Sequence, residues 1–173
     1  MARVALLVGI CLTTAGSQYS CSANSGGSID DGNDPEFAST LTLRNISGVE
    51  TASFVFGEPV RLDFEIVNLT NRQQRVQFPD AQTHDFLIVN GGTAVVRWKW
   101  SDAQAFAQVT TELVFESNAS KTFTLYWPGT LADGTQLPVG TYQARAALVF
   151  GGFKADPLAD SDLGSDLEVF TVR

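Results

Sequence analysis

The chain has 173 residues, a formal net charge of −8, a pI near 4.4 and 44% hydrophobic residues. This acidic balance argues against nucleic acid as a partner, because binding to a phosphate backbone depends on Lys and Arg side chains that displace counterions. Both cysteines, Cys11 and Cys21, lie close to the N-terminus, so the rest of the chain holds neither a disulfide nor a thiolate metal site.

Residues 1–20 are predicted to be a signal peptide. Arg3 precedes an apolar run at 4–12, which is shorter than the roughly 20 residues that a transmembrane helix needs. Residues 21–38, rich in Gly, Ser and Asp, are predicted to be a flexible polar tether, since they cannot bury apolar surface. Export is therefore expected.

Cys21, placed between leader and tether, resembles the lipid-bearing cysteine of a bacterial lipoprotein, whose acyl chains supply membrane affinity. The preceding Gln18-Tyr19-Ser20 departs from the usual lipoprotein pattern, in which Leu stands three residues before the cysteine. We expect a lipid anchor on Cys21 and a membrane-anchored place in the cell envelope. Plain secretion after cleavage near residues 15–17 is the alternative.

From Ser39 onward the hydrophobic pattern has a period of two. The clearest run is 59–68, in which four apolar side chains alternate with Arg61, Asp63 and Glu65. Similar short runs are predicted at 41–46, 73–78, 86–88, 96–100, 109–115, 123–127, 142–150 and 167–172. Asn90-Gly91-Gly92 is a strong hairpin signal.

These runs predict an all-β domain over residues 39–173, with seven to nine short strands and no substantial helix. Frequent turn signals between such strands are typical of an antiparallel β-sandwich or a barrel, and the length favours the sandwich. Roughly 130 residues are enough to bury a core without disulfides.

Residues suited to catalysis or metal binding are scarce. His84 is the single histidine, which excludes a site with two or three histidine ligands, and no G-x-S-x-G elbow accompanies it. The His84-Asp85 pair is interpreted as part of a turn. The acidic stretches at 30–34 and 156–168 carry oxygen ligands suited to calcium but lack the EF-hand spacing, so they are interpreted as solvated loops. We predict no catalytic residue, metal or cofactor, and hence no enzyme.

One series of motifs is more specific. The chain reads Asp85-Phe86-Leu87-Ile88, then Val96-Arg97-Trp98-Lys99-Trp100-Ser101, Phe106-Ala107-Gln108, a strand ending in Trp127, and Pro138-Val139-Gly140-Thr141-Tyr142. This order and spacing resemble those of the intracellular proteinase inhibitor (BsuPI) family, with a W-R-W-S segment, F-x-Q, a strand ending in W and P-P-G-T-Y. Here His84, Lys99 and Val139 stand where the family usually has Tyr, Arg and a second Pro.

The resemblance implies an immunoglobulin-like β-sandwich that binds and inhibits a serine proteinase. The residues that carry it are expected to be mainly structural: Asp85, Phe86, Trp98, Trp100, Phe106, Gln108, Trp127, Pro138, Gly140 and Tyr142. Trp98 and Trp100 are predicted to pack in the core. Gly140 is expected to be a turn glycine with free φ, and Tyr142 to anchor a turn through its hydroxyl.

The resulting hypothesis is an exported, non-enzymatic domain that binds a protein partner. Inhibition would proceed by occlusion, either by a loop, with 101–108 and 128–138 as candidates, or by an edge strand. One alternative is a structural or assembly module of the envelope without inhibitory activity. A polysaccharide-binding sandwich is another, and exposed rather than buried Trp98, Trp100 or Trp127 would favour it.

Overall fold

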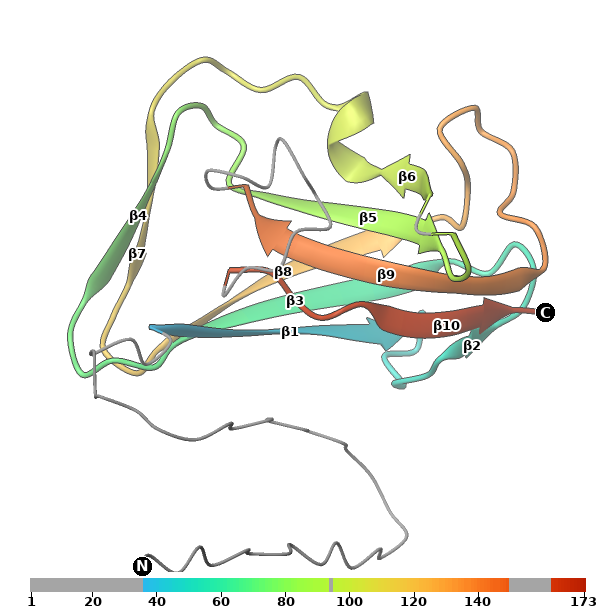
Figure 1. Ribbon diagram of the computed structural model, residues 1–173, viewed down its shortest axis with the longest axis horizontal. Coiled ribbons are helices and arrows are strands. Elements are labelled where there is room, and N and C mark those ends of the chain that lie inside the picture. Colours follow the sequence, from blue (N-terminus) through green and yellow to red (C-terminus); the bar gives the residue numbers. More distant parts are fainter. Residues whose placement is uncertain (1–35, 94, 150–162) are drawn as a thin grey trace, which may run out of the picture. The chain divides into compact units, whose positions relative to one another are not determined.

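The structure is a computed structural model that describes residues 36–93, 95–149 and 163–173 (Figure 1). The predicted signal peptide, Cys21, the acidic stretch 30–34 and most of the acidic stretch 156–168 lie outside these residues. Within them, no helix is long and apolar enough to cross a membrane.

The described residues form ten strands and one short 3₁₀ helix, η1. The strands are β1 (Phe37–Arg44), β2 (Ser53–Phe54), β3 (Val60–Asn68), β4 (Gln74–Phe78), β5 (His84–Asn90), β6 (Val96–Lys99), β7 (Thr111–Phe115), β8 (Ser120–Trp127), β9 (Gly140–Leu148) and β10 (Glu168–Val172), and η1 spans Trp100–Ala103. The prediction of an all-β, immunoglobulin-like sandwich is confirmed. The nine predicted runs correspond to nine of these strands, and the two-residue β2 was not foreseen.

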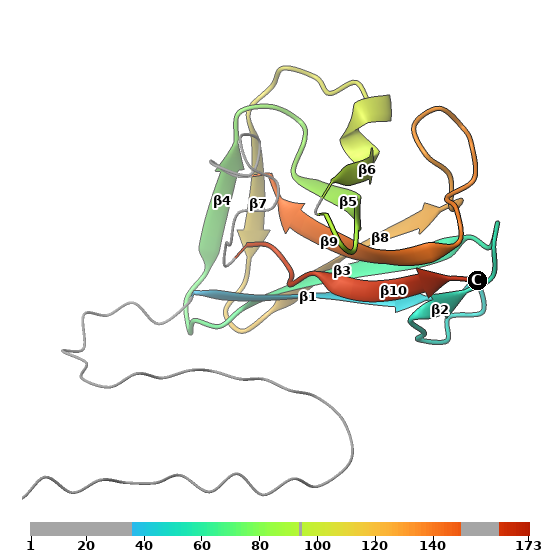
Figure 2. The same cartoon turned by 45° about the vertical axis from the view of Figure 1, so that its right-hand side comes forward.

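Two sheets make up the sandwich. One has the order β1-β3-β8 and the other β2-β10-β9-β5-β6, while β4 and β7 form a separate two-stranded ribbon. All pairings are antiparallel except that of β10 with β2. In both views the β4–β7 ribbon stands at one end of the two larger sheets (Figures 1 and 2).

The core lies between the two larger sheets because each presents the apolar half of a period-two pattern. In β3 the residues alternate strictly, with Leu62 and Phe64 buried and Asp63 between them facing outward. Phe64 meets Phe86 of the opposite sheet edge-to-face, with ring centroids 6.3 Å apart. A second apolar cluster, Leu87 with Val89, Ala147 and Val149, is buried on the other face of β5 and β9. These two strands are therefore buried on both faces.

A corner at Asn68 ends the β3–β8 ladder. The Asn68 side chain is fully buried, and its Nδ2 lies 2.7 Å from the carbonyl oxygen of Arg72, 2.9 Å from that of Glu116 and 3.3 Å from that of Phe115. Its Oδ1 accepts hydrogen bonds from the backbone N–H and the hydroxyl of Thr70. The chain turns here from β3 into the β4–β7 ribbon because one side chain replaces the lost ladder contacts.

Three details differ from the sequence pattern. β1 begins at Phe37, inside the stretch assigned to the tether, because the Phe37 ring packs edge-to-face on Phe115 at 5.1 Å. The strand predicted to reach residue 100 ends at Lys99, and Trp100 opens η1. Finally, a strand that the pattern did not predict, β2, pairs with the end of β10 through Thr171 and Val172.

Candidate functional site

The first of the two candidate loops, 101–108, starts from a buried carboxylate. Asp85 lies in β5, not in a turn as the sequence suggested, and its side chain is fully buried. Asp85 Oδ1 accepts hydrogen bonds from the backbone N–H of Phe86 (2.9 Å) and of Ser101 (3.1 Å). Gln82 donates to Oδ2 at 3.1 Å, and the Lys99 ammonium lies 3.6 Å from that oxygen. Asp85 therefore ties β5 to the start of the loop.

Aromatic contacts hold the rest of this loop. Trp100 meets Phe106 edge-to-face at 5.7 Å, and the carbonyl oxygen of Ala107 accepts a hydrogen bond from Ala81 N–H at 2.9 Å. Gln108 is exposed, and its Nε2 lies 3.4 Å from the carbonyl oxygen of Phe106. The loop is fixed near both ends, and its residues 102–105 are exposed to solvent.

His84 contacts Trp100, the residue that precedes the same loop. Its ring stacks on Trp100 with centroids 5.1 Å apart and an interplanar angle of 11°, and it lies 4.3 Å from the Phe123 ring. Burial lowers the pKa of His84 from 6.5 to about 4, since the charged imidazolium would lose its hydration there. His84 is the first residue of β5 rather than a turn residue, and it is neutral at pH 7.

The second candidate loop, 128–138, is anchored at both ends by core aromatics. Trp127 is 1% exposed, and its indole N–H donates to the carbonyl oxygen of Thr130 at 2.9 Å. Tyr142 donates its hydroxyl to the carbonyl oxygen of Pro138, also at 2.9 Å. Trp98 packs against Trp127 with ring centroids 5.4 Å apart. These aromatic side chains fix the positions at which the loop leaves and rejoins the sandwich.

Backbone hydrogen bonds brace the loop from within. The N–H of Leu137, a buried residue, donates to the carbonyl oxygen of Gly129 at 2.8 Å, and Leu131 N–H donates to that of Thr135 at 2.7 Å. At the tip, Asp133 Oδ1 accepts hydrogen bonds from the N–H and the hydroxyl of Thr135. These hydrogen bonds, with a further contribution from Arg97, lower the pKa of Asp133. Hydrogen bonds within the loop thus hold the exposed tip at 132–136.

Glycine geometry corrects one expectation. Gly140 is not in the left-handed region; it is the first residue of β9, and a Cβ on it would lie 3.4 Å from the Tyr142 ring. The left-handed glycines of this loop are Gly129, with φ of 73°, and Gly134, with φ of 81°. A Cβ on Gly129 would also lie 3.1 Å from the carbonyl oxygen of Glu58. Both the left-handed backbone and this close contact therefore favour glycine at position 129.

The motif residues therefore fall into two groups that the fold brings to two loops. The residues within or beside loop 101–108 are Asp85, Trp100, Phe106 and Gln108. Those within loop 128–138 or near its ends are Trp98, Trp127, Pro138, Gly140 and Tyr142. Phe86 lies in the core. The sequence did not reveal the roles of Gln82 and Leu137. Their contacts are with backbone or side chains that only the fold brings near.

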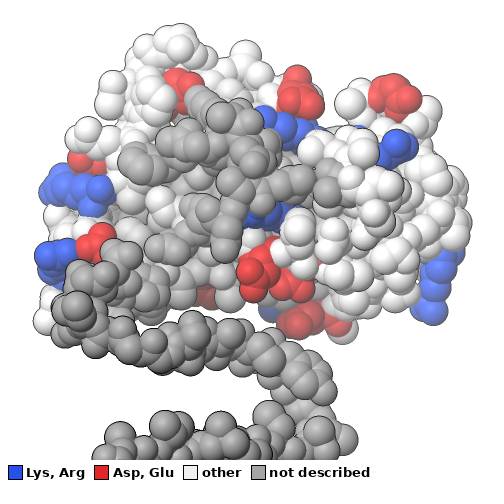
Figure 3. Space-filling view, viewed as in Figure 1, with Lys and Arg blue, Asp and Glu red and all other residues white. Residues whose placement is uncertain are grey.

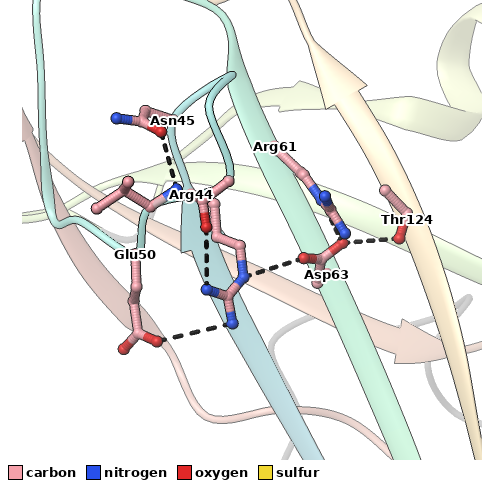
Figure 4. A network of polar contacts seen from close by, with 8 residues as sticks. Arg44, Asn45, Glu50, Arg61, Asp63 and Thr124 are labelled. Atoms are coloured by element: carbon pink, nitrogen blue, oxygen red, sulfur yellow. Dashed lines mark hydrogen bonds and ion pairs between the residues drawn. The ribbon is translucent and has the colours of Figure 1, made fainter.

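A separate polar network lies on the outer face of the β1-β3-β8 sheet (Figure 4). Asp63 accepts hydrogen bonds from Arg44 (3.2 Å), Arg61 (2.9 Å) and Thr124 (2.7 Å), and Glu50 lies 3.8 Å from Arg44. Burial alone would raise the pKa of Asp63, but the hydrogen bonds from Arg61 and Thr124 hold it below its usual value. The network pairs the charges of Arg44 and Arg61 with those of Asp63 and Glu50.

Charge is dispersed over the visible part of one face of the molecule. On the face shown in Figure 3, Lys and Arg side chains alternate with Asp and Glu and form no extended basic surface. Among the residues that the structure describes, no three His, Cys, Asp or Glu side chains form a group that could hold a metal ion.

Comparison with known proteins gave one match at the level of a family. A family model described as "BsuPI: Intracellular proteinase inhibitor" matches residues 48–152. This range includes both candidate loops and every motif residue discussed above. No curated protein sequence matched the chain.

Several solved structures are similar to the chain, each at low sequence identity. The alkylpurine DNA glycosylase AlkC of Pseudomonas fluorescens has 12% identity and a TM-score of 0.46, over 82% of this chain and 32% of its own. The C-terminal domain of Wzt has 13% identity and a TM-score of 0.48, over 81% and 80%. The CARDB domain of a Pyrococcus furiosus protein has 10% and 0.40, over 80% and 96%. The chain thus spans about a third of the glycosylase, and likenesses this weak say nothing about function.

Proposed function

The chain belongs to the intracellular proteinase inhibitor (BsuPI) family, and on that premise we propose that it is a non-enzymatic domain that binds and inhibits a serine proteinase. The family match supports the proteinase as partner. The dispersed polar surface and the two anchored loops support binding rather than catalysis.

Loop 128–138 is the proposed inhibitory element. The observation that carries this choice is the double anchor, in which Trp127 holds Thr130 at one end and Tyr142 holds Pro138 at the other. A loop that is already ordered loses little conformational entropy when it binds, so more of its contact energy appears as affinity. Seated in a substrate cleft, the tip at 132–136 would block access without needing a reactive group.

Loop 101–108 is the second candidate for the contact. It is anchored through Asp85 and Trp100, but its exposed part, 102–105, has fewer internal hydrogen bonds than the tip of loop 128–138. Trp127 is buried, and Trp98 and Trp100 pack half-buried against the core. None of the three tryptophans is therefore in the exposed class, which argues against the polysaccharide-binding alternative.

The decisive experiment is a titration of the purified full chain against a panel of serine proteinases, with matched loop variants. Ala132→Arg and Ala105→Arg place the same bulky cation on exposed positions of the two loops. We expect Ala132→Arg to raise the inhibition constant at least about tenfold, a change of roughly 1.4 kcal/mol, and Ala105→Arg to leave it nearly unchanged. The reverse pattern would move the site to loop 101–108. A folded chain that inhibits no proteinase at micromolar concentration would refute the proposal.

Export and membrane attachment are part of the same proposal. They are supported by the leader-like residues 1–20, by Cys21 and by the polar residues that follow it. The mass of the mature N-terminal peptide tests this directly. A diacylglycerol-sized increase on Cys21 supports an envelope lipoprotein, whereas an unmodified N-terminus near residues 16–18 supports secretion. An intact residue 1 would contradict export.

A further inference from the structure

Among the residues that the structure describes, strand β8 has a long edge without a partner. It spans eight residues and pairs with β3 on one side only. Asn68 N–H donates to the carbonyl oxygen of Ala119, which fixes the odd-numbered residues of this strand as those that bond toward β3. Thr122, Thr124 and Tyr126 therefore direct their N–H and C=O groups outward. Within residues 36–93, 95–149 and 163–173, these groups meet no hydrogen-bond partner.

The other sheet edges are shorter or partly covered. Thr51 N–H donates to the carbonyl oxygen of Leu43, which occupies part of the β1 edge, and β2 pairs with the end of β10. The β6 edge is only four residues long. Proteins usually protect long edges because an unpaired edge is a template for another strand. Of the strands in the described residues, β8 stands out as long and uncovered.

The side chains of β8 also suit a strand partner. Thr122, Thr124 and Tyr126 are exposed on the outer face, while Phe123 and Leu125 are half-buried on the inner face. An added strand would extend the sheet and cover the exposed parts of both apolar side chains. The edge thus combines unsatisfied backbone groups with apolar surface that remains to be buried.

The local charges of β8 are compatible with a second copy of the same edge. Lys121 is the one charged residue of β8, and the nearby Asp63 is neutralised by Arg44 and Arg61. Glu65 of β3 lies opposite Thr122, one strand in from the edge. Although the whole chain carries a net charge of −8, β8 itself has no carboxylate that would face a second copy. Self-pairing is not blocked locally.

We propose that β8 pairs antiparallel with β8 of a second copy of this chain, centred on Thr124. In this register Thr122 lies opposite Tyr126 of the other copy, and Phe123 lies opposite Leu125. Both pairings, β-branched with aromatic and aromatic with aliphatic, are favourable across strands, and Lys121 meets no like charge. The β1-β3-β8 sheets of the two copies become one continuous six-stranded sheet. This association does not depend on the proposed inhibition of a proteinase.

Cysteine cross-linking tests the register. The full chain with Cys11→Ser and Cys21→Ser contains no thiol and no lipid that could cause association. Thr124→Cys in this background should form a disulfide-linked dimer, because Cα atoms of a directly opposed pair lie about 5.5 Å apart. Thr122→Cys is the matched control and should not cross-link, since its two copies would lie about 13 Å apart along the strands. Equal or inverted cross-linking would overturn the proposal.

Backbone pairing is tested by Thr122→Pro, measured by sedimentation in the same thiol-free chain. Proline removes an outward N–H and leaves the β3 ladder intact, so the domain should keep its thermal unfolding temperature. We expect the dimer dissociation constant to rise about 30-fold, because two intermolecular hydrogen bonds are lost. Thr122→Val keeps the N–H and should not change it. A thiol-free chain that stays monomeric up to sub-millimolar concentration, or a dimer indifferent to Thr122→Pro, would refute the pairing.

Discussion

The Tyr142 hydroxyl donates a hydrogen bond to the carbonyl oxygen of Pro138, 2.9 Å away, and this contact closes loop 128–138 onto β9. At the other end of the loop, the Trp127 indole makes the equivalent contact with Thr130. Two of the residues by which the sequence resembles its family thus act on the loop rather than on a partner. They determine its shape, which is what an inhibitory loop needs.

Tyr142→Phe should loosen this loop with little effect on the core. The ring remains packed on Phe170, at 5.8 Å between centroids, while the hydroxyl contact is lost. We expect the free energy of unfolding to fall by about 1 kcal/mol, and protease cleavage within 128–138 to accelerate. Tyr126→Phe removes a hydroxyl from an exposed tyrosine and should change the unfolding free energy by less than about 0.5 kcal/mol. Equal effects of the two variants would contradict the anchoring role.

Asp85→Ala should destabilise the protein strongly. It leaves Ser101 N–H without its acceptor and Lys99 without its buried counter-charge. We expect a loss of about 3 kcal/mol in the free energy of unfolding, measured by urea denaturation. Asp102→Ala, an exposed acid in the same loop, is the control and should have little effect. An Asp85→Ala loss below about 1 kcal/mol would show that the carboxylate is not structural.

His84 should make the domain sensitive to acid. Because burial lowers its pKa from 6.5 to about 4, the unfolded chain binds the proton more readily than the folded one. The stabilising contribution is complete above pH 6.5 and is lost as pH falls toward 4. Between pH 7 and 4.5 we expect His84 to account for about 2 to 3 kcal/mol of lost stability.

His84→Phe checks this assignment, since it keeps an aromatic ring against Trp100 and cannot titrate. The variant should lose less stability than the wild type on going from pH 7 to 4.5. Asp63 should contribute little to the pH dependence between pH 7 and 4.5. Its pKa is lowered from 3.8, so the stability that it supplies is lost only at more acidic pH. An identical pH dependence in both proteins would place the acid sensitivity elsewhere.

Asn68→Ala should open the corner between β3 and the β4–β7 ribbon. Its buried amide lies within hydrogen-bond distance of the carbonyl oxygens of Arg72, Phe115 and Glu116, and alanine would remove all three contacts. We expect a loss of about 3 kcal/mol or more in unfolding free energy, with faster hydrogen exchange in β4 and β7. Asn71→Ala, an exposed neighbour, is the matched control. Unchanged exchange in the ribbon would contradict the role of Asn68.

The strands themselves could be predicted from the sequence, because period-two alternation is a local property. Val60, Leu62 and Phe64 had to share one face whatever lay opposite. The order of the motifs likewise identified the family, since spacing along a chain reflects the spacing of strands and turns. What alternation could not predict was Asp85, a charged residue that is fully buried because Ser101, Gln82 and Lys99 surround it.

The tertiary structure decided everything that depends on residues far apart in the chain. Ser53 pairs with Thr171, and Trp98 of β6 packs on Trp127 of β8. Such contacts follow from the balance between loop-closure entropy and burial over the whole domain, which no local pattern contains. The sequence by itself determined a β-sandwich of this family. Only the packed fold decided that its motif residues brace two loops, and that β8 was left with an open edge.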